Sequence, residues 1–232
     1  MSVIAQQLEE VRGLVGKACS AAGRDPAEVT LVAVSKTFPA EDIQQAVDAG
    51  QQVFGESRLQ EAEPKIAQLP GGLQWHFIGR VQRNKVRKIL PLFGYIHAVD
   101  SLKLVTYMDG IAKDLGLVPK IFLQVNLAGE DSKGGFSEAE ITSSMEEISR
   151  LTNLEVIGLM MIPPADDDAG KWFRALWELR GTLEEKYSVK LPCLSMGMSG
   201  DYAEAISEGA THVRIGSAIF GKRDYKVEGE LG

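Results

Sequence analysis

The sequence predicts an α/β protein, a (β/α)8 TIM barrel, on three observations. Short apolar segments rich in β-branched and aromatic residues alternate with amphipathic helical segments, which is typical of parallel βα units. This alternation fills most of the 232 residues without a linker-like stretch, so we expect one domain spanning 1–232. Residues with unusual chemistry lie at strand ends along the whole chain. An open doubly wound sheet, the alternative fold, would gather such residues at a single crevice.

Eight segments are predicted as strands from their apolar, β-prone composition. They cover residues 29–35, 52–55, 74–78, 95–99, 120–126, 154–160, 191–195 and 212–215. Helices are predicted between them at 41–49, 57–68, 83–90, 102–115, 138–149, 169–187 and 202–208, and glycines close several of these. An extra N-terminal helix over 4–22 is predicted because apolar residues recur there at helical spacing and Gly23 follows.

Composition and charge exclude several classes of function. The chain has 25 Lys and Arg against 32 Asp and Glu, a formal charge of −7 that should repel nucleic acid. One basic cluster, at 80–88, lacks interleaved aromatic residues, so an exposed helix face is the favoured interpretation. No apolar run approaches the roughly 18 residues of a membrane helix, and the N-terminus lacks a signal-peptide pattern. We therefore expect a cytoplasmic protein that binds neither membranes nor nucleic acid. Its two cysteines, Cys19 and Cys193, are too few for a disulfide framework.

A lysine follows the first predicted strand. Lys36 comes after the apolar run VTLVAVS and before Thr37-Phe38-Pro39, so it is expected at the carboxyl ends of the strands, the mouth of the barrel. An ordinary lysine leaving a strand for solvent is one interpretation. Partial desolvation would instead favour the neutral amine, which can condense with a carbonyl as a Schiff base. This lysine alone does not decide between the two.

Two loops late in the chain have the features of a phosphate site. In LSMGMSGD, Ser199 is placed to cap the helix that follows, and in THVRIGSAIFG, Arg214 precedes a Gly216-Ser217 turn. These are the loops after strands seven and eight, where barrels frequently bind a phosphate group. Each loop alone could be an unremarkable turn. Together with Lys36 they favour a phosphorylated carbonyl ligand, and pyridoxal 5′-phosphate is such a ligand.

Other chemistries find little support. The histidines His76, His97 and His212 stand apart without HExxH spacing, no CxxC pair is present, and no serine lies in a GxSxG elbow, so no metal site or catalytic triad is expected. His76 is interpreted as a packed strand residue. The absence of a Walker loop or GxGxxG after a strand disfavours a nucleotide-dependent enzyme. Asn126 and the loop at 133–135 could also line the mouth.

Seven motifs carry a family resemblance. They are AVSKTFP (33–39), FGESRLQE (54–61), WHFIGRVQRNK (75–85), SKGGF (132–136), GLMMIPP (158–164), SMGMSGDYAEAI (195–206) and VRIGSAIFGKRDY (213–225). The chain, from about residue 29 to residue 225, resembles the pyridoxal-phosphate homeostasis proteins, single-domain relatives of the alanine racemase N-terminal barrel. The probability that several motifs of this length occur by chance in the same order is very small.

The resemblance implies that pyridoxal 5′-phosphate is held as a Schiff base on Lys36. Ser199, Gly216 and Ser217 would bind the phosphate, and Arg214 would face the pyridine nitrogen. The residues that we assign to the cofactor are Lys36, Ser57, Met198, Ser199, Arg214, Gly216 and Ser217.

The same resemblance implies a role in intracellular vitamin B6 cofactor homeostasis without catalytic turnover. A guanidinium at the pyridine nitrogen cannot accept a proton, so Arg214 should leave the ring neutral and a poor electron sink. We expect no room in the chain for the second domain of the racemases, and we expect a monomer. An amino-acid racemase-like enzyme, or an aldolase-type enzyme using Lys36 without the cofactor, is the alternative.

Three positions depart from the family pattern. Ser57 replaces an asparagine near the cofactor ring, Arg58 replaces a tyrosine, and Met161 stands where a smaller residue is usual. Natural divergence is the favoured explanation, and an engineered variant of this scaffold is the alternative.

Overall fold

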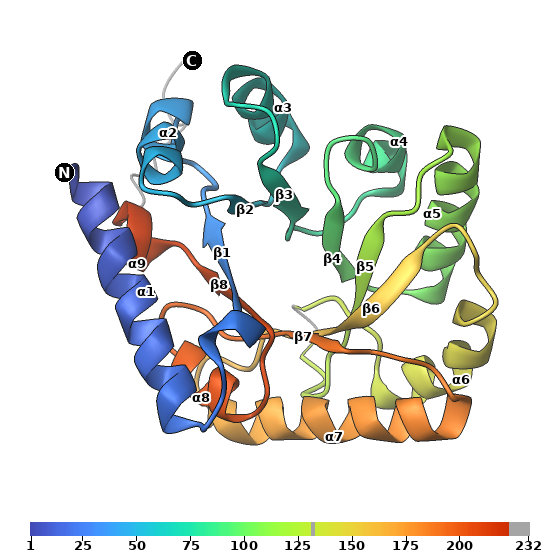
Figure 1. Ribbon diagram of the computed structural model, residues 1–232. Helices are drawn as coiled ribbons and strands as arrows, with labels where there is room; N and C mark the ends of the chain where they lie inside the picture. The colour runs from blue at the N-terminus through green and yellow to red at the C-terminus, as the bar shows by residue number, and fades with distance from the viewer. Residues whose placement is uncertain (131–132, 223–232) are drawn as a thin grey trace, which may run out of the picture.

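The computed structural model describes residues 1–130 and 133–222. Within these residues, eight parallel strands form a closed barrel in chain order, and β1 pairs with β8 to close it (Figure 1). The strands are β1 (Thr30–Val34), β2 (Val53–Glu56), β3 (Gln74–Phe77), β4 (Tyr95–Val99), β5 (Lys120–Gln124), β6 (Glu155–Met160), β7 (Cys193–Ser195) and β8 (His212–Ile215). The predicted (β/α)8 barrel is confirmed, and the open doubly wound sheet is wrong.

Helices surround the barrel (Figure 1). They are α1 (Val3–Ala21), α2 (Ala40–Asp48), α3 (Leu59–Gln68), α4 (Val86–Ile89), α5 (Leu102–Leu115), α6 (Glu138–Ile148), α7 (Ala169–Tyr187), α8 (Tyr202–Ser207) and α9 (Ser217–Phe220), with the 3-10 helices η1 (Pro26–Glu28) and η2 (Arg83–Lys85). In the part of the chain that the structure describes, no helix has the length and apolar character needed to cross a membrane.

The N-terminal helix α1 joins the first and last units of the barrel. Its N-cap residue Ser2 accepts a hydrogen bond at Oγ from the N–H of Ala5, at 3.2 Å. One face of α1 is buried and packs against α2, α8 and α9. Just after the helix, Arg24 donates from Nη1 to the carbonyl oxygens of Ile206 and Ala210. The segment before β1 is therefore fixed to the C-terminal part of the fold.

Apolar side chains pack on both sides of the sheet. The larger cluster lies between strands and helices and includes Trp75 and Phe77 of β3. A smaller cluster consists of Ala98, Phe122, Ile157 and Met160. Side chains alternate along a strand, so His76, between Trp75 and Phe77, points the opposite way, toward the barrel interior. The interior therefore holds polar rings beside an apolar cluster.

Predicted and observed element boundaries agree within two residues, with three differences in kind, one of which is the unpredicted η1. The helix predicted at 83–90 is split into η2 and α4. The 3-10 turn of residues 83–85 leads directly into α4, and such turns are frequent at helix N-termini. The short helix α9 was not predicted, because a four-residue helix has no measurable periodicity.

Candidate functional site

The ends of β1 and β8 bring two predicted site residues to the mouth of the barrel. The two strands pair through Ala33 and Ile215, so half-buried Lys36 and buried Gly216 follow neighbouring strand ends. A Cβ on Gly216 would lie 3.1 Å from the carbonyl oxygen of Val34. Glycine thus permits the close approach of the loop after β8 to the end of β1.

The backbone just after Lys36 has an unusual conformation. Thr37 has φ of 72°, in the left-handed region that residues other than glycine rarely adopt. Its N–H donates to Glu61 Oε2 at 3.2 Å, and Glu61 Oε1 accepts from Arg58 Nη1 at 3.1 Å. Helix α3 therefore holds the turn that follows Lys36.

The backbone just before Lys36 is held by a buried ionic network. Lys65 Nζ donates to the carbonyl oxygen of Ser35 at 3.0 Å and to Glu56 Oε1 at 2.8 Å. The Ser35 hydroxyl donates to the same carboxylate oxygen at 2.7 Å. Burial raises the pKa of Glu56, and Lys65 opposes this shift. Side chains of α3 thus fix the chain on both sides of Lys36.

Arg214 lies in the barrel interior with two protein partners. Its Nη1 donates to Ser195 Oγ at 2.5 Å, and its Nη2 donates to the carbonyl oxygen of Met161 at 3.0 Å. Burial lowers the pKa of Arg214 to about 10, and the charge of Asp201 partly offsets this. The guanidinium therefore stays charged at neutral pH. Because it has five N–H groups, it keeps further donors for a ligand.

The loops after β7 and β8 meet through two serines. The Ser217 hydroxyl donates to Ser199 Oγ at 3.2 Å. The predicted helix-capping role of Ser199 is wrong, because α8 starts after Asp201 and the Asp201 carboxylate instead accepts from the N–H of Met198 at 2.5 Å. Met198 is 37% exposed in this turn. In α9 the N–H groups of Ile219 and Phe220 donate to the Gly216 carbonyl oxygen at 2.9 Å, whereas those of Ser217 and Ala218 precede any acceptor within the helix.

Ser57 lies just past β2, in the loop before α3, where the sequence predicted the first helical residue. A Cβ on Gly79 would lie 2.1 Å from the Ser57 carbonyl oxygen, so the loops after β2 and β3 are in close contact. Arg58 is exposed and pairs with Glu61 at 3.1 Å. The Met161 side chain is buried in the cluster between strands and helices. Its contact with the site is therefore the carbonyl oxygen that binds Arg214.

The barrel also brings together side chains that the sequence left apart. The Ser195 hydroxyl lies 2.7 Å from His97 Nδ1, and His97 Nε2 lies 2.8 Å from His76 Nδ1. The His212 ring lies 5.9 Å from that of His76. Burial lowers the pKa of all three histidines, for His212 to about 4. The alternation of His76 with large outward-facing aromatic residues was the signal that could have placed it inside.

Asn126 and Lys133 stabilise the loop after β5. Asn126 Nδ2 donates to the carbonyl oxygens of Glu130 and Lys133, both at 2.9 Å. Lys133 Nζ donates to the carbonyl oxygen of Pro163 at 2.7 Å. These contacts are structural, and the prediction that these residues line the ligand site stays a prediction.

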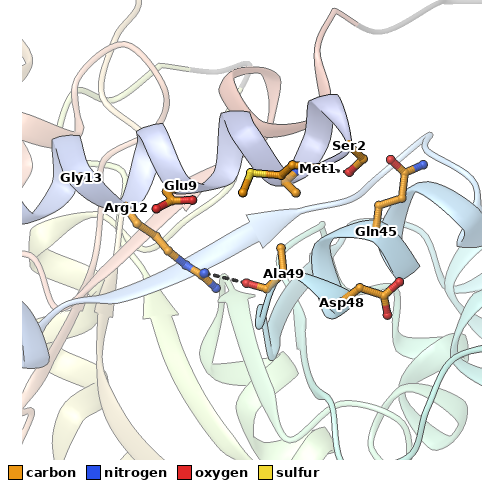
Figure 2. A pocket seen from close by; sticks show the side chains of 9 residues that line it. Met1, Ser2, Glu9, Arg12, Gly13, Gln45, Asp48 and Ala49 are labelled. Carbon is orange, nitrogen blue, oxygen red and sulfur yellow. Dashed lines mark hydrogen bonds between the residues drawn. The ribbon is translucent and has the colours of Figure 1, made fainter.

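A cavity of about 890 Å³ lies outside the barrel between α1 and α2 (Figure 2). Arg12 extends from α1 and donates from Nη1 to the carbonyl oxygen of Ala49, at 2.8 Å. The lining residues are Met1, Ser2, Ala5, Glu9, Arg12, Gly13, Gln45, Asp48 and Ala49. None of the predicted cofactor residues is among them, so this cavity is separate from the candidate site.

Known proteins place the chain in a family. The family model for the N-terminal domain of alanine racemase matches residues 18–224. A pyridoxal phosphate homeostasis protein of Pseudomonas aeruginosa is 44% identical over 229 residues, covering 97% of this chain and 98% of that protein. The chain belongs to the pyridoxal phosphate homeostasis protein family. Another member, from Aquifex aeolicus, is 41% identical over 224 residues, covering 95% of this chain and 98% of that protein.

A solved structure also supports the fold and the family membership of this chain. PipY of Synechococcus elongatus, solved with pyridoxal phosphate bound, aligns with a TM-score of 0.85 at 38% identity. The alignment covers 94% of this chain and all of that one. The resemblance predicted from the seven sequence motifs is thus confirmed.

Proposed function

We propose that this protein binds pyridoxal 5′-phosphate, attached through Lys36, and takes part in vitamin B6 cofactor homeostasis. The observation that carries the proposal is the convergence of Lys36, Arg214 and the Ser199–Ser217 pair at the ends of β1, β7 and β8. PipY, to which the chain is similar, is a structure with this cofactor bound. We also propose that the protein is a cytoplasmic monomer.

The donor groups at the mouth match the chemistry of this cofactor. Lys36 supplies an amine for its aldehyde, and Arg214 supplies N–H donors for its pyridine nitrogen. The Ser199 and Ser217 hydroxyls, with the N–H groups at Gly216 and the start of α9, suit its phosphate. Ser57 and Met198, from other loops of the same mouth, would lie beside its ring. When bound, the cofactor supplies an electrophilic carbon and an electron-withdrawing ring.

Arg214 favours binding without turnover. Its guanidinium remains protonated at neutral pH even with a pKa lowered to about 10. It can donate a hydrogen bond to a ring nitrogen but cannot receive a proton from it. The two protein acceptors of Arg214, Ser195 Oγ and the Met161 carbonyl, fix the position of the guanidinium. Stabilisation of carbanions at the ring would therefore be weak.

Covalent trapping tests the proposal. The purified protein incubated with pyridoxal 5′-phosphate should absorb visible light, and borohydride should fix a pyridoxyl mass on the peptide that contains Lys36. Lys36→Ala should lose both signals, whereas Lys85→Ala, which changes a lysine outside the site, should keep them. A colourless wild-type protein without an adduct would overturn the proposal.

A racemase-like enzyme is the alternative function. Its test is the loss of deuterium from the Cα of alanine or serine in the presence of the protein. We expect no loss above the rate given by free cofactor. Exchange that depends on Lys36 would instead establish an enzyme.

A further inference from the structure

A continuous chain of buried polar groups runs from Arg214 into the barrel interior. Arg214 Nη1 contacts Ser195 Oγ at 2.5 Å, Ser195 Oγ contacts His97 Nδ1 at 2.7 Å, and His97 Nε2 contacts His76 Nδ1 at 2.8 Å. This hydrogen-bonded chain ends at His76, whose ring stacks on that of Tyr95, the first residue of β4, with the ring centroids 4.2 Å apart. It therefore extends from the mouth toward the amino ends of the strands.

We infer that Ser195, His97 and His76 are positioning residues that hold Arg214 in place. They do so through hydrogen bonds in which each proton lies on one defined atom, which we call the proton order. The inference rests on the proposed function, because it assigns Arg214 to the pyridine nitrogen of the cofactor. It gives a role to three residues to which the family resemblance assigned none.

Hydrogen-bond chemistry sets the proton order. The Arg214 guanidinium can only donate, so Ser195 Oγ accepts from it. The Ser195 hydroxyl is then free to donate to His97 Nδ1, which places the His97 proton on Nε2. That N–H donates to His76 Nδ1, and the His76 proton lies on Nε2.

The reverse order would satisfy fewer groups. If His97 Nδ1 carried the proton, Ser195 Oγ would accept twice and its own hydroxyl hydrogen would have no partner in the contacts above. His76 Nε2 is buried and has no hydrogen-bond partner among the described residues in either order. The first order therefore leaves one unsatisfied group and the reverse order leaves two. Because buried unsatisfied groups are costly, the first order is favoured.

Burial keeps the two histidines in the state that this order needs. His76 and His97 are fully buried, and burial lowers the pKa of both. Neutral rings each provide one donor and one acceptor, whereas an imidazolium provides two donors and would break the chain. A hydroxyl that donates to an imidazole is also a stronger acceptor, so the histidines strengthen the bond from Ser195 to Arg214.

His97 and His212 offer a matched pair of positions for a test. Both rings lie beside Phe122, with ring centroids 4.3 and 5.1 Å from that of Phe122, but only His97 belongs to the hydrogen-bonded chain. His97→Leu removes the acceptor for Ser195 and puts an apolar side chain in its place. His97→Asn places an amide oxygen near the position of Nδ1 and should restore that acceptor. His212→Leu is the control for lost packing.

The first measurement uses the cofactor-free protein. Long-range proton–nitrogen NMR at neutral pH should show His97 protonated at Nε2 only, with Nδ1 accepting a hydrogen bond. In Ser195→Ala the Nδ1 signal should shift to that of a free acceptor. A His97 proton on Nδ1, or a cationic ring, would overturn the proposed order even if the protein bound no cofactor.

The second measurement is titration with pyridoxal 5′-phosphate followed by visible absorption. Ser195→Ala and His97→Leu should weaken binding about tenfold and shift the absorption maximum, since the ring-nitrogen donor is displaced. His97→Asn and His212→Leu should bind like the wild type. Wild-type affinity and spectrum in His97→Leu would overturn the positioning role. Failure of wild-type protein to bind would overturn the proposed function alone.

Discussion

Lys65 Nζ donates to the carbonyl oxygen of Ser35 at 3.0 Å, so a buried ammonium group holds the residue that immediately precedes Lys36. The same ammonium neutralises Glu56, whose side chain is fully buried. Helix α3 thus links the stability of the barrel wall to the position of the proposed attachment lysine.

Removing the ammonium should be strongly destabilising. Lys65→Met leaves the Glu56 carboxylate buried without its charge partner, and we expect a loss of about 3 kcal/mol in the free energy of unfolding. Urea denaturation measures this loss. Arg87→Met is the control, because the Arg87–Asp114 pair is exposed and should contribute under about 1 kcal/mol. Equal stability of the two variants would contradict the assignment, and adding Glu56→Gln to Lys65→Met should recover part of the loss.

The buried histidines should make stability fall in mild acid. Burial lowers the pKa of His76, His97 and His212 in the folded state, to about 4 for His212, while an unfolded histidine titrates near 6.5. The unfolded chain therefore binds more protons below about pH 6.5, and stability present above that pH is lost toward about pH 4.

Each histidine adds up to about 1.4 kcal/mol per pH unit to this slope. Glu56, whose pKa is raised by burial, acts in the opposite direction between its ordinary pKa and the raised one, because the folded chain binds more protons there. Urea unfolding at about pH 7 and about pH 5 should show the loss. The His212→Leu variant should have a slope shallower by roughly the share of one histidine, and an unchanged slope would contradict the prediction.

Gly79 should tolerate no side chain. A Cβ there would lie 2.1 Å from the Ser57 carbonyl oxygen, so Gly79→Ala must displace the loop after β2 and should destabilise the fold by about 1–3 kcal/mol. Thermal unfolding reports the change. Gly110→Ala in α5 is the control, since nothing lies within 4 Å of its Cβ and alanine favours helix. A Gly79→Ala variant as stable as Gly110→Ala would show that the loop adapts without cost.

Ser199 should discriminate between phosphorylated and unphosphorylated ligand. Its hydroxyl meets that of Ser217 at 3.2 Å, at the position proposed for the phosphate. Ser199→Ala should weaken binding of pyridoxal 5′-phosphate by about tenfold, because a hydrogen bond to a charged group is lost. Binding of pyridoxal, which lacks the phosphate, should not change. Equal losses for both ligands, measured by absorption titration, would remove Ser199 from the phosphate site.

The sequence predicted those features that depend on local pattern. Apolar strands and helical spacing located the eight βα units, and Lys36 with the Gly216-Ser217 turn marked strand ends that a closed barrel must bring to one mouth. The capping role assigned to Ser199 failed because the carboxylate of Asp201 binds the N–H of Met198 and the helix starts later.

Local sequence patterns could not predict contacts between strands that are distant in the sequence. The link from Arg214 through Ser195 to His97 joins β8, β7 and β4, and their separation in sequence conceals it. The Lys65–Glu56 pair was hidden for a different reason, since the two residues are close in sequence but a lysine on an amphipathic helix is usually exposed. Register and barrel closure, which set these contacts, are properties of the whole sheet.

The pairing of β1 with β8 also sets the moment at which the proposed site comes into existence. Lys36 is synthesised before Arg214 and Gly216, which follow it by almost the whole length of the barrel. The site forms only when the final strand docks beside the first. Binding of a ligand that contacts both strands would then report completed folding. By mass action such a ligand would also stabilise the closed barrel relative to a state in which β8 is not paired with β1.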